Sequence, residues 1–313
     1  MSSKKLAIVC TINNSKLHTL SFAGHFENIP GCRLILFLDE PRHTLYFEHR
    51  CFPDRITIVP CTKQHWLESL GALPKDMPEK QHTNLRRGAM LAKEMGYEWA
   101  LSLDSDELVV NLEGLLEQID TLGQGVDMLR LKPFELIHNE ATAYSNRPFG
   151  GEYFRINLGW DLLMERREQL QSELKNRLMA LKPLTRRLFF GHTNGKTIFR
   201  LSAPITQFKQ HKQFSDKRKL VGKVLPTQFP ILHFDAMNFK TWKFKWKRRL
   251  SGKTKATAIS EQRKRQTDMI AESMRWHSWG AARRLFNEWY VFSDDEVDQM
   301  LSAQLIMKRQ GSF

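Results

Sequence analysis

Short apolar runs alternate with a helical pattern over the first 110 residues of the chain. Residues 6–10, 34–38 and 55–59 are apolar-rich runs of strand length. Over residues 79–96, apolar side chains instead recur at helical spacing, and Gly96 supplies a C-terminal stop. Continuous apolar strands that alternate with helices are typical of a parallel sheet covered by helices on both faces.

The pattern continues less regularly along the rest of the chain. It predicts a helix over residues 112–122, a strand over 127–131, a basic helical segment over 161–187, and strands over 197–201 and 229–233. The remainder is predicted to be helical, and Ser293 with Glu296 forms a capping box that opens the last helix. No internal repeat interrupts this order. We therefore expect one α/β domain over residues 1–250 and a basic helical C-terminal extension over 251–313.

One predicted strand, residues 99–103, ends in the sequence Asp104-Ser105-Asp106-Glu107. Crowded carboxylates disfavour one another's ionisation, so such a cluster calls for a cation. Oxygen ligands without a nearby cysteine suit Mg2+ or Mn2+ better than zinc. Because ligands of open α/β sheets bind beyond the carboxyl ends of the strands, a metal there can hold the phosphates of a nucleotide. The alternative is that Asp104 or Ser105 only caps the turn that follows.

Composition sets the broad class of the protein. The 313 residues are 41% hydrophobic and 11% aromatic, as expected of a globular chain with an ample core. No apolar run approaches the roughly 20 residues that span a bilayer, and the N-terminal apolar run is too short for a secretion signal. The four cysteines show no CxxC spacing and are expected to be reduced thiols. These features predict a cytoplasmic protein.

The net charge of +14 belongs wholly to the second half of the chain. Residues 1–150 carry 16 Lys and Arg against 19 Asp and Glu, a net charge of −3, and residues 151–313 carry 32 against 15, a net charge of +17. A surface this basic attracts nucleic acid, anionic lipid or phosphate-bearing substrates. A basic nucleic-acid-binding protein is therefore one alternative function, although it leaves the acidic strand end unexplained.

A longer pattern resembles the nucleotide-sugar glycosyltransferases of the GT-A fold, especially bacterial family 2-like members. It comprises Gln81, Asn84, Arg87-Gly88-Ala89, Ala92, Gly96, Glu98-Trp99 and Leu103-Asp104-Ser105-Asp106-Glu107. Downstream, Ile231-Leu232-His233-Phe234 followed by Trp242, Lys245 and Arg248 is similar to a second segment of related transferases.

The resemblance implies a Rossmann-like, mainly parallel sheet flanked by helices, with a donor-binding half over residues 1–110 and an acceptor half over 111–250. It also implies a metal-dependent, inverting hexosyl- or related transferase that uses Mn2+ or Mg2+. Such an enzyme moves a sugar from a nucleotide-sugar donor to a glycan or lipid-linked glycan acceptor, for example in surface polysaccharide synthesis. Nucleotidyl or phosphoryl transfer with Mg2+, which also uses paired aspartates, is the alternative enzymatic function.

The same resemblance implies roles for individual residues. Asp106 and Asp104 would bind the metal, and Asp104 also the donor ribose. His233 would complete the metal shell, with a satisfied core histidine as the alternative. The side chains expected beside the base, ribose and phosphates of the donor are Thr11, Asn13, Asp39, Asn84 and Arg87; local turn chemistry explains the first three equally well.

Basic and glycine-rich segments supply further candidates for substrate binding. In Gly191–Lys196, glycines let backbone N–H groups approach an anion and Lys196 adds positive charge, although an ordinary hairpin loop fits as well. Lys245 and Arg248 are expected to clamp the donor diphosphate. For the base that deprotonates the acceptor hydroxyl, the candidates are Glu135, His192 and His211.

Tryptophans interleave with lysines and arginines over residues 239–250 at helical spacing. Two interpretations are open. The helix docks on an anionic membrane surface, which would place the protein at the inner face of the membrane beside a lipid-linked acceptor. Alternatively, it packs its aromatic side chains onto the domain while its charges face water.

Overall fold

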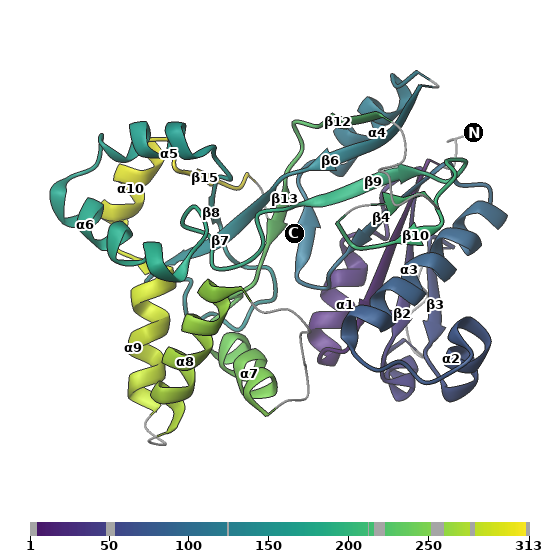
Figure 1. Ribbon diagram of the computed structural model, residues 1–313, viewed down its shortest axis with the longest axis horizontal. Coiled ribbons are helices and arrows are strands. Elements are labelled where there is room, and N and C mark those ends of the chain that lie inside the picture. The colour runs from purple at the N-terminus through teal and green to yellow at the C-terminus, as the bar shows by residue number, and fades with distance from the viewer. Residues whose placement is uncertain are drawn as a thin grey trace. The chain divides into compact units, whose positions relative to one another are not determined.

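The computed structural model describes residues 5–47, 54–123, 125–211, 213–215, 223–251, 260–275 and 279–310. The chain divides into two compact units (Figure 1). The first unit comprises Met1–Lys132 and Asn194–Ile231, and the second comprises Pro133–Thr193 and Leu232–Phe313. Each unit therefore consists of two separate stretches of sequence.

The first unit is an α/β structure around a seven-stranded sheet with the strand order β12-β6-β9-β4-β1-β2-β3. The strands are β1 (Leu6–Ile12), β2 (Cys32–Leu38), β3 (Ile56–Pro60), β4 (Trp99–Leu103), β6 (Val126–Leu131), β9 (Lys196–Arg200) and β12 (Lys223–Pro226). Strands β1 to β4 run parallel, as predicted. Strand β12 also pairs parallel with β6, whereas β9 runs antiparallel to both of its neighbours, so the sheet is mixed rather than wholly parallel.

Helices flank this sheet. They are α1 (Lys16–Gly24), α2 (Lys63–Leu70), α3 (Met77–Glu94) and α4 (Leu112–Asp120), with the 3-10 helix η1 (Pro41–Tyr46) after β2. Helix α3 lies across the strands in Figure 1. Its apolar face packs on side chains that alternate along β1 and β2, as the two-residue period of a strand requires. The short strand β5 (Glu107–Val109) and the hairpin of β10 (Gln207–Phe208) and β11 (Gln213–Phe214) complete the unit.

The second unit combines short strands with most of the C-terminal helices. Strand β8 (Tyr153–Arg155) pairs antiparallel with β7 (Pro133–Asn139) and with β15 (Ile306–Lys308), and β14 (Val291–Phe292) pairs parallel with β7. The helices are α5 (Trp160–Arg167), α6 (Ser172–Ala180), η2 (Lys182–Leu184), α7 (Phe239–Leu250), α8 (Glu261–Arg275), α9 (Trp279–Tyr290) and α10 (Asp294–Ser302). Strand β13 (Ile231–His233) begins at the last residue of the first unit.

Several boundaries refine the sequence analysis. The segment over 161–187 is broken into α5, α6 and η2 rather than forming one helix. The strand predicted over 229–233 starts only at Ile231, because Pro230 has no N–H for a ladder hydrogen bond. The capping box at α10 is confirmed: Glu296 N–H donates to Ser293 Oγ (3.2 Å), and Ser293 N–H donates to Glu296 Oε2 (2.9 Å).

The tryptophans of α7 belong to the core of the second unit. Trp242 and Trp246 are buried and cluster with Phe286, Trp289 and Tyr290 of α9. The packing interpretation of residues 239–250 is therefore the right one for these side chains. Across the residues that the structure describes, no helix has the length and apolar character needed to cross a membrane. The division into a domain over 1–250 and an extension over 251–313 stays a prediction.

Candidate functional site

The polar edge of the first unit lies where its strand order reverses. Strands β1, β2 and β3 add in one direction, and β4 then returns to the opposite side of β1. Ligands of open α/β sheets bind at this kind of switch point, beyond the carboxyl ends of the strands. Asn14, just after β1, donates to Ser105 Oγ (2.9 Å), just after β4, and His18 Nε2 lies 2.7 Å from the Ser105 carbonyl oxygen. These bonds join the two strand ends.

Within the acidic turn, Asp104 and Glu107 share one buried lysine. Lys196 Nζ lies 2.7 Å from Asp104 Oδ2 and 3.2 Å from Glu107 Oε2, and only 1% of the Lys196 side chain is exposed. Burial by itself lowers the pKa of Lys196, but the two carboxylates outweigh it and raise the pKa above its ordinary value. Lys196 therefore supplies part of the positive charge that this carboxylate cluster requires.

Two amides fix the position of Asp104 further. Gln81 of α3 and Gln210 donate to Asp104 Oδ1 at 2.9 and 3.0 Å, and the Asp104 N–H donates to Glu107 Oε2 at 2.8 Å. Asp106 lies beyond these contacts at the tip of the turn and is partly exposed. Asp104 and Glu107 are thus held in place by the buried Lys196, and Asp106 lies between them in the sequence of the turn.

The predicted donor-binding residues at β1 and β2 come together in two pairs. Asn84 of α3 donates to Thr11 Oγ1 (3.0 Å), and its Oδ1 lies 2.9 Å from His65 Nε2. Asn13 donates to Asp39 Oδ2 (3.1 Å). Both pairs lie at the carboxyl ends of neighbouring parallel strands, on the same side as the acidic turn.

The arginine predicted beside these pairs lies elsewhere on the helix surface. Arg87 is exposed on α3. Lys80, one of the residues that the sequence analysis missed, pairs with Asp39 Oδ1 at 2.6 Å, just as Lys196 pairs with Asp104. Asp39 and Asp104 thus each form an ion pair with a lysine. The signal for Lys80 was its place on α3, one turn before Asn84.

The loop before β9 uses its backbone donors on an acid of the chain. In the second unit, Phe190 and Gly191 donate their N–H groups to the two oxygens of Glu135, at 3.0 and 2.5 Å. Arg155 Nη1 lies 3.3 Å from the same carboxylate. The loop thus has the anion-binding character that its glycine suggested, but the anion is Glu135.

The three candidate bases differ in access. Glu135 is fully buried, and burial is the main reason that its pKa is raised, with Arg155 acting in the opposite direction. His192 is exposed. His211, in the first unit, is partly exposed and places its Nδ1 2.6 Å from the Gly195 carbonyl oxygen.

A second polar group in the second unit follows β13. His233 Nε2 and Asp235 Oδ1 are 4.0 Å apart, and Asp235 also forms an ion pair with Lys245 of α7. Burial would raise the pKa of Asp235, but Lys245, Arg249, His233 and Arg263 together hold it well below its usual range. Arg248, the other predicted clamp residue, is half-buried beside the Phe244 ring, with 5.8 Å between its Cζ and the ring centre.

Side chains whose chemistry suits a metal ion occur in each unit: Asp106 in the first, and His233 and Asp235 in the second. A divalent cation such as Mn2+ accepts both carboxylate oxygens and imidazole nitrogens as ligands. Asp235 was missed by the sequence analysis. The sequence did indicate Asp235, because it lies only two residues after His233, just beyond the end of the same strand.

Comparison with known proteins adds little. No protein-family model and no curated protein matches the chain. The chain has weak structural similarity to a solved structure described as a "putative UDP-N-acetylglucosamine pyrophosphorylase from Entamoeba histolytica". The two are 11% identical with a TM-score of 0.26, over 75% of this chain and 71% of that chain. A likeness at this level assigns neither fold family nor function.

Proposed function

We propose that the protein is a metal-dependent glycosyltransferase of the GT-A type that uses a nucleotide-sugar donor. One observation carries the proposal: the acidic turn after β4 lies at the switch point of the sheet, beside the polar pairs that follow β1 and β2. This edge joins a carboxylate suited to a metal with hydroxyl and amide groups suited to a ribose and a base. It is the place where an open α/β sheet binds nucleotides.

In this proposal the two polar pairs hold the nucleoside. Thr11 and Asn84 would contact the base, and Asn13 and Asp39 would bind the ribose hydroxyls. Lys80 and Lys196 form ion pairs with Asp39 and Asp104, whose carboxylate oxygens are hydrogen-bond acceptors. Arg87 would reach a phosphate from the exposed face of α3.

The diphosphate would be held by a metal and by basic side chains. Asp106 is the proposed ligand from the first unit, with Asp104 and Lys196 beside the ion rather than among its closest ligands. When bound, the ion would supply stabilisation of the negative charge on the departing diphosphate. His233 as a further ligand, and Lys245 and Arg248 as diphosphate-binding residues, stay proposals that rest on the sequence resemblance.

Of the three candidate bases, we favour His192 for the acceptor hydroxyl. An exposed imidazole can reach a substrate hydroxyl, and the acceptor nitrogen of a neutral imidazole can take up its proton. Glu135 is fully buried and already accepts two backbone N–H groups, which gives it a structural role in the second unit. A glycan or lipid-linked glycan is the proposed acceptor class.

The test is release of nucleoside diphosphate from a panel of nucleotide-sugars with Mn2+ or Mg2+. Asp106→Asn is expected to lower this metal-dependent release by roughly 100-fold or more, because the amide loses the charge that binds the ion. Asp54→Asn, a matched change at an exposed aspartate of the same unit, should leave release unchanged. Thermal unfolding of both variants should equal that of the original protein.

Two outcomes would change the assignment. Full activity in Asp106→Asn removes that residue from the site. Pyrophosphate in place of nucleoside diphosphate would identify a nucleotidyltransferase, the alternative that shares the acidic turn and the metal.

A further inference from the structure

The second unit contains a pocket that the proposed function does not use. It has a volume of about 250 Å3 and lies among α5, α6, η2 and the turn that follows η2. This volume is below the roughly 300 Å3 at which pockets for drug-sized ligands begin, so it suits a small molecule. The pocket falls within the basic segment over 161–187 that the sequence analysis singled out.

The pocket is basic, and no carboxylate lines it. Its charged lining residues are Arg167, Lys182, Arg186 and Arg187. Arg167 has an acidic neighbour in Glu168, with which it forms an ion pair outside the lining. Lys182, Arg186 and Arg187 are exposed, and no ion pair joins any of them to an acid within the described part of the chain. Three cations without acidic partners around one hollow favour an anionic ligand.

The same pocket has an apolar and aromatic side. Trp160 is 41% exposed, and Lys182 Nζ lies 5.0 Å from the centre of its ring. Met164, Met179 and Leu178 line the wall beside it. An exposed indole and flexible thioethers accept a flat apolar group without demanding a specific hydrogen bond. The lining therefore suits a ligand that has both an anionic end and an apolar body.

Backbone strain marks the basic side of the pocket. Arg186 and Phe189 exchange two backbone hydrogen bonds of 3.0 Å, which closes a tight turn over Arg187 and Leu188. Both central residues have positive φ, +55° and +65°, as in a type I′ turn. Such turns are dominated by Gly, Asn and Asp, and a left-handed conformation is strained for other residues because their Cβ crowds the following carbonyl oxygen. Strain of this kind persists where the surroundings hold it, commonly at ligand sites.

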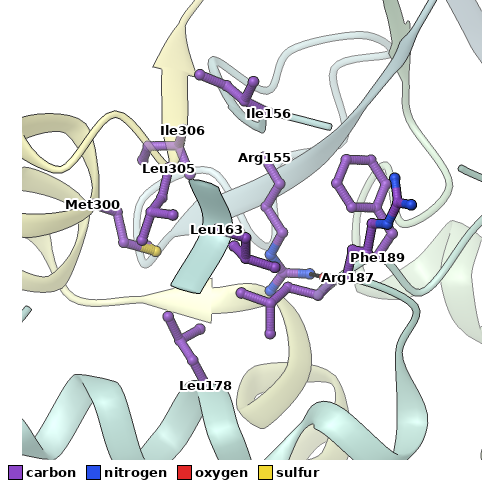
Figure 2. A pocket seen from close by; sticks show the side chains of 10 residues that line it. Arg155, Ile156, Leu163, Leu178, Arg187, Phe189, Met300, Leu305 and Ile306 are labelled. Carbon is purple, nitrogen blue, oxygen red and sulfur yellow. Dashed lines mark hydrogen bonds between the residues drawn. The ribbon is translucent and has the colours of Figure 1, made fainter. Parts of the chain in front are cut away.

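Arg155 holds this turn in place from below. Its Nη1 donates to the Leu188 carbonyl (3.0 Å) and its Nη2 to the Trp289 carbonyl (2.9 Å). Arg155 borders a small gap of about 10 Å3. In Figure 2, Met300, Leu305 and Ile306 lie on one side of Arg155 and Phe189 on the other. Leu178, Arg187 and Leu188 line both this gap and the pocket. The packed side chains next to the pocket, with Arg155 among them, thus hold the strained turn in its conformation.

We propose that this pocket binds a small organic phosphate with a flat apolar body. The phosphate would lie against Arg186, Arg187 and Lys182, and the apolar body would lie against Trp160 and the methionines. The proposed ligand has both a charged group and an apolar body. It should therefore bind more tightly than a free phosphate ion or an uncharged aromatic molecule does. The site is independent of the nucleotide edge of the first unit.

The test is a calorimetric titration of the full chain with 1-naphthyl phosphate, compared with inorganic phosphate and 1-naphthol. We expect saturable binding of 1-naphthyl phosphate that is at least tenfold tighter than binding of either half-molecule. Arg186→Ala and Arg187→Gly should each weaken it roughly tenfold, because each removes one hydrogen bond to a charged group. Arg284→Ala, an exposed arginine of α9 outside the lining, is the matched control.

The variant Arg187→Gly separates binding from folding. Glycine adopts positive φ without strain, so this variant should unfold at a temperature no lower than the original protein while it binds more weakly. Weaker binding with unchanged folding supports the site. Equal binding by the original protein and both pocket variants, or 1-naphthol binding as tightly as its phosphate, overturns it. Absence of saturable binding by the original protein overturns it as well. None of these results depends on glycosyl transfer.

Discussion

Buried ionisable residues in this protein keep one protonation state because a specific neighbour favours it. Lys196 remains charged because Asp104 and Glu107 lie beside it, which outweighs the penalty of burial. His138 shows the opposite case. It is fully buried on β7, its Nε2 lies 2.7 Å from the Ala236 carbonyl oxygen, and desolvation lowers its pKa to about 4. The ring is therefore neutral in the folded protein at neutral pH.

His138 is expected to make the protein sensitive to mild acid. Its pKa falls from 6.5 in the unfolded chain to about 4 in the folded one. The unfolded chain therefore takes up the proton first as the pH falls. The contribution of the neutral His138 ring to the free energy of unfolding is complete above pH 6.5. It is lost as the pH falls from 6.5 to about 4. The loss amounts to about 3 kcal/mol.

Urea denaturation at pH 7, 6, 5 and 4 measures this loss. His138→Gln keeps an N–H donor for the Ala236 carbonyl but does not titrate, so its stability should fall less steeply over this range. His192→Gln, at an exposed position, should follow the original protein. If the free energy of unfolding fell equally with pH in the original protein and in His138→Gln, His138 would not be the source of the acid sensitivity.

At the residue scale, the sequence indicated which polar residues lie at the strand ends better than it indicated their contacts. Asp104, Asp39 and Asn84 stood out because polar side chains directly after or beside apolar strands are unusual; their role in binding stays a prediction. Lys196 was also found, but as a substrate ligand, whereas its ammonium is buried against two acids. Its position could not be deduced, because it depends on β9 running antiparallel to β4, and neither strand's apolar pattern encodes direction.

At the element scale, the doubly covered strands were the most predictable. Strands β1, β2 and β4 are buried along almost their whole length, so each appears as an unbroken apolar run. Helix α3 was predictable from its periodicity. The basic segment over 161–187 was not, because α5, the turn and α6 all keep leucines toward the core while the backbone direction changes between them.

The contact between α3 and β1 limits residue size at Gly88. A Cβ atom there would lie 2.6 and 2.8 Å from the two methyl groups of Val9, too close for a side chain as short as valine to move aside. Alanine gains about 1 kcal/mol of helix propensity, but overpacking costs about 1–3 kcal/mol. We expect Gly88→Ala to lower the free energy of unfolding by about 1 kcal/mol, the difference between these two effects.

Two further variants isolate that packing effect in denaturation experiments. The Val9→Ala change removes the obstructing methyl groups, so introducing Gly88→Ala into the Val9→Ala background should no longer destabilise the protein. Gly24→Ala, on α1, has nothing within 4 Å of the new Cβ and should not destabilise the protein. A Gly88→Ala protein as stable as the original would show that α3 and β1 are less closely packed than described.

At the scale of the whole molecule, the chain passes from the first unit to the second and back between two neighbouring strands of the large sheet. The first crossing follows β6, and the chain returns just before β9. Strands β6 and β9 are antiparallel neighbours, and Leu131 of β6 lies opposite Lys196 of β9. Residues 133–193 therefore form an insertion between two strands that would otherwise make a simple hairpin. The return crossing falls in the polar, glycine-containing segment Gly191–Lys196, but the first crossing, at Lys132 and Pro133, lies directly between two strands without such a segment, so composition predicted one continuous domain.

This topology predicts that the first unit folds without the second. The strand order places β9 between β4 and β6, in the middle of the sheet, so a chain that ends at residue 132 lacks a central strand and the buried Lys196. Such a chain should not fold. A chain of residues 1–132 and 194–231, joined by a short Asn-Gly turn, keeps all seven strands and the α3 core. It should fold as a unit, because Leu131 and Lys196 are already paired across that junction.

Circular dichroism during thermal unfolding distinguishes the two shortened chains. The joined chain is expected to show α/β secondary structure and one cooperative transition, and the chain ending at residue 132 is expected to show neither. In the joined chain, Lys196→Met should abolish or weaken the transition, because Asp104 and Glu107 then lose their buried cation. Loss of cooperative unfolding in the joined chain itself would mean that the second unit is required for the sheet to form. In that case the two compact units would constitute one folding domain.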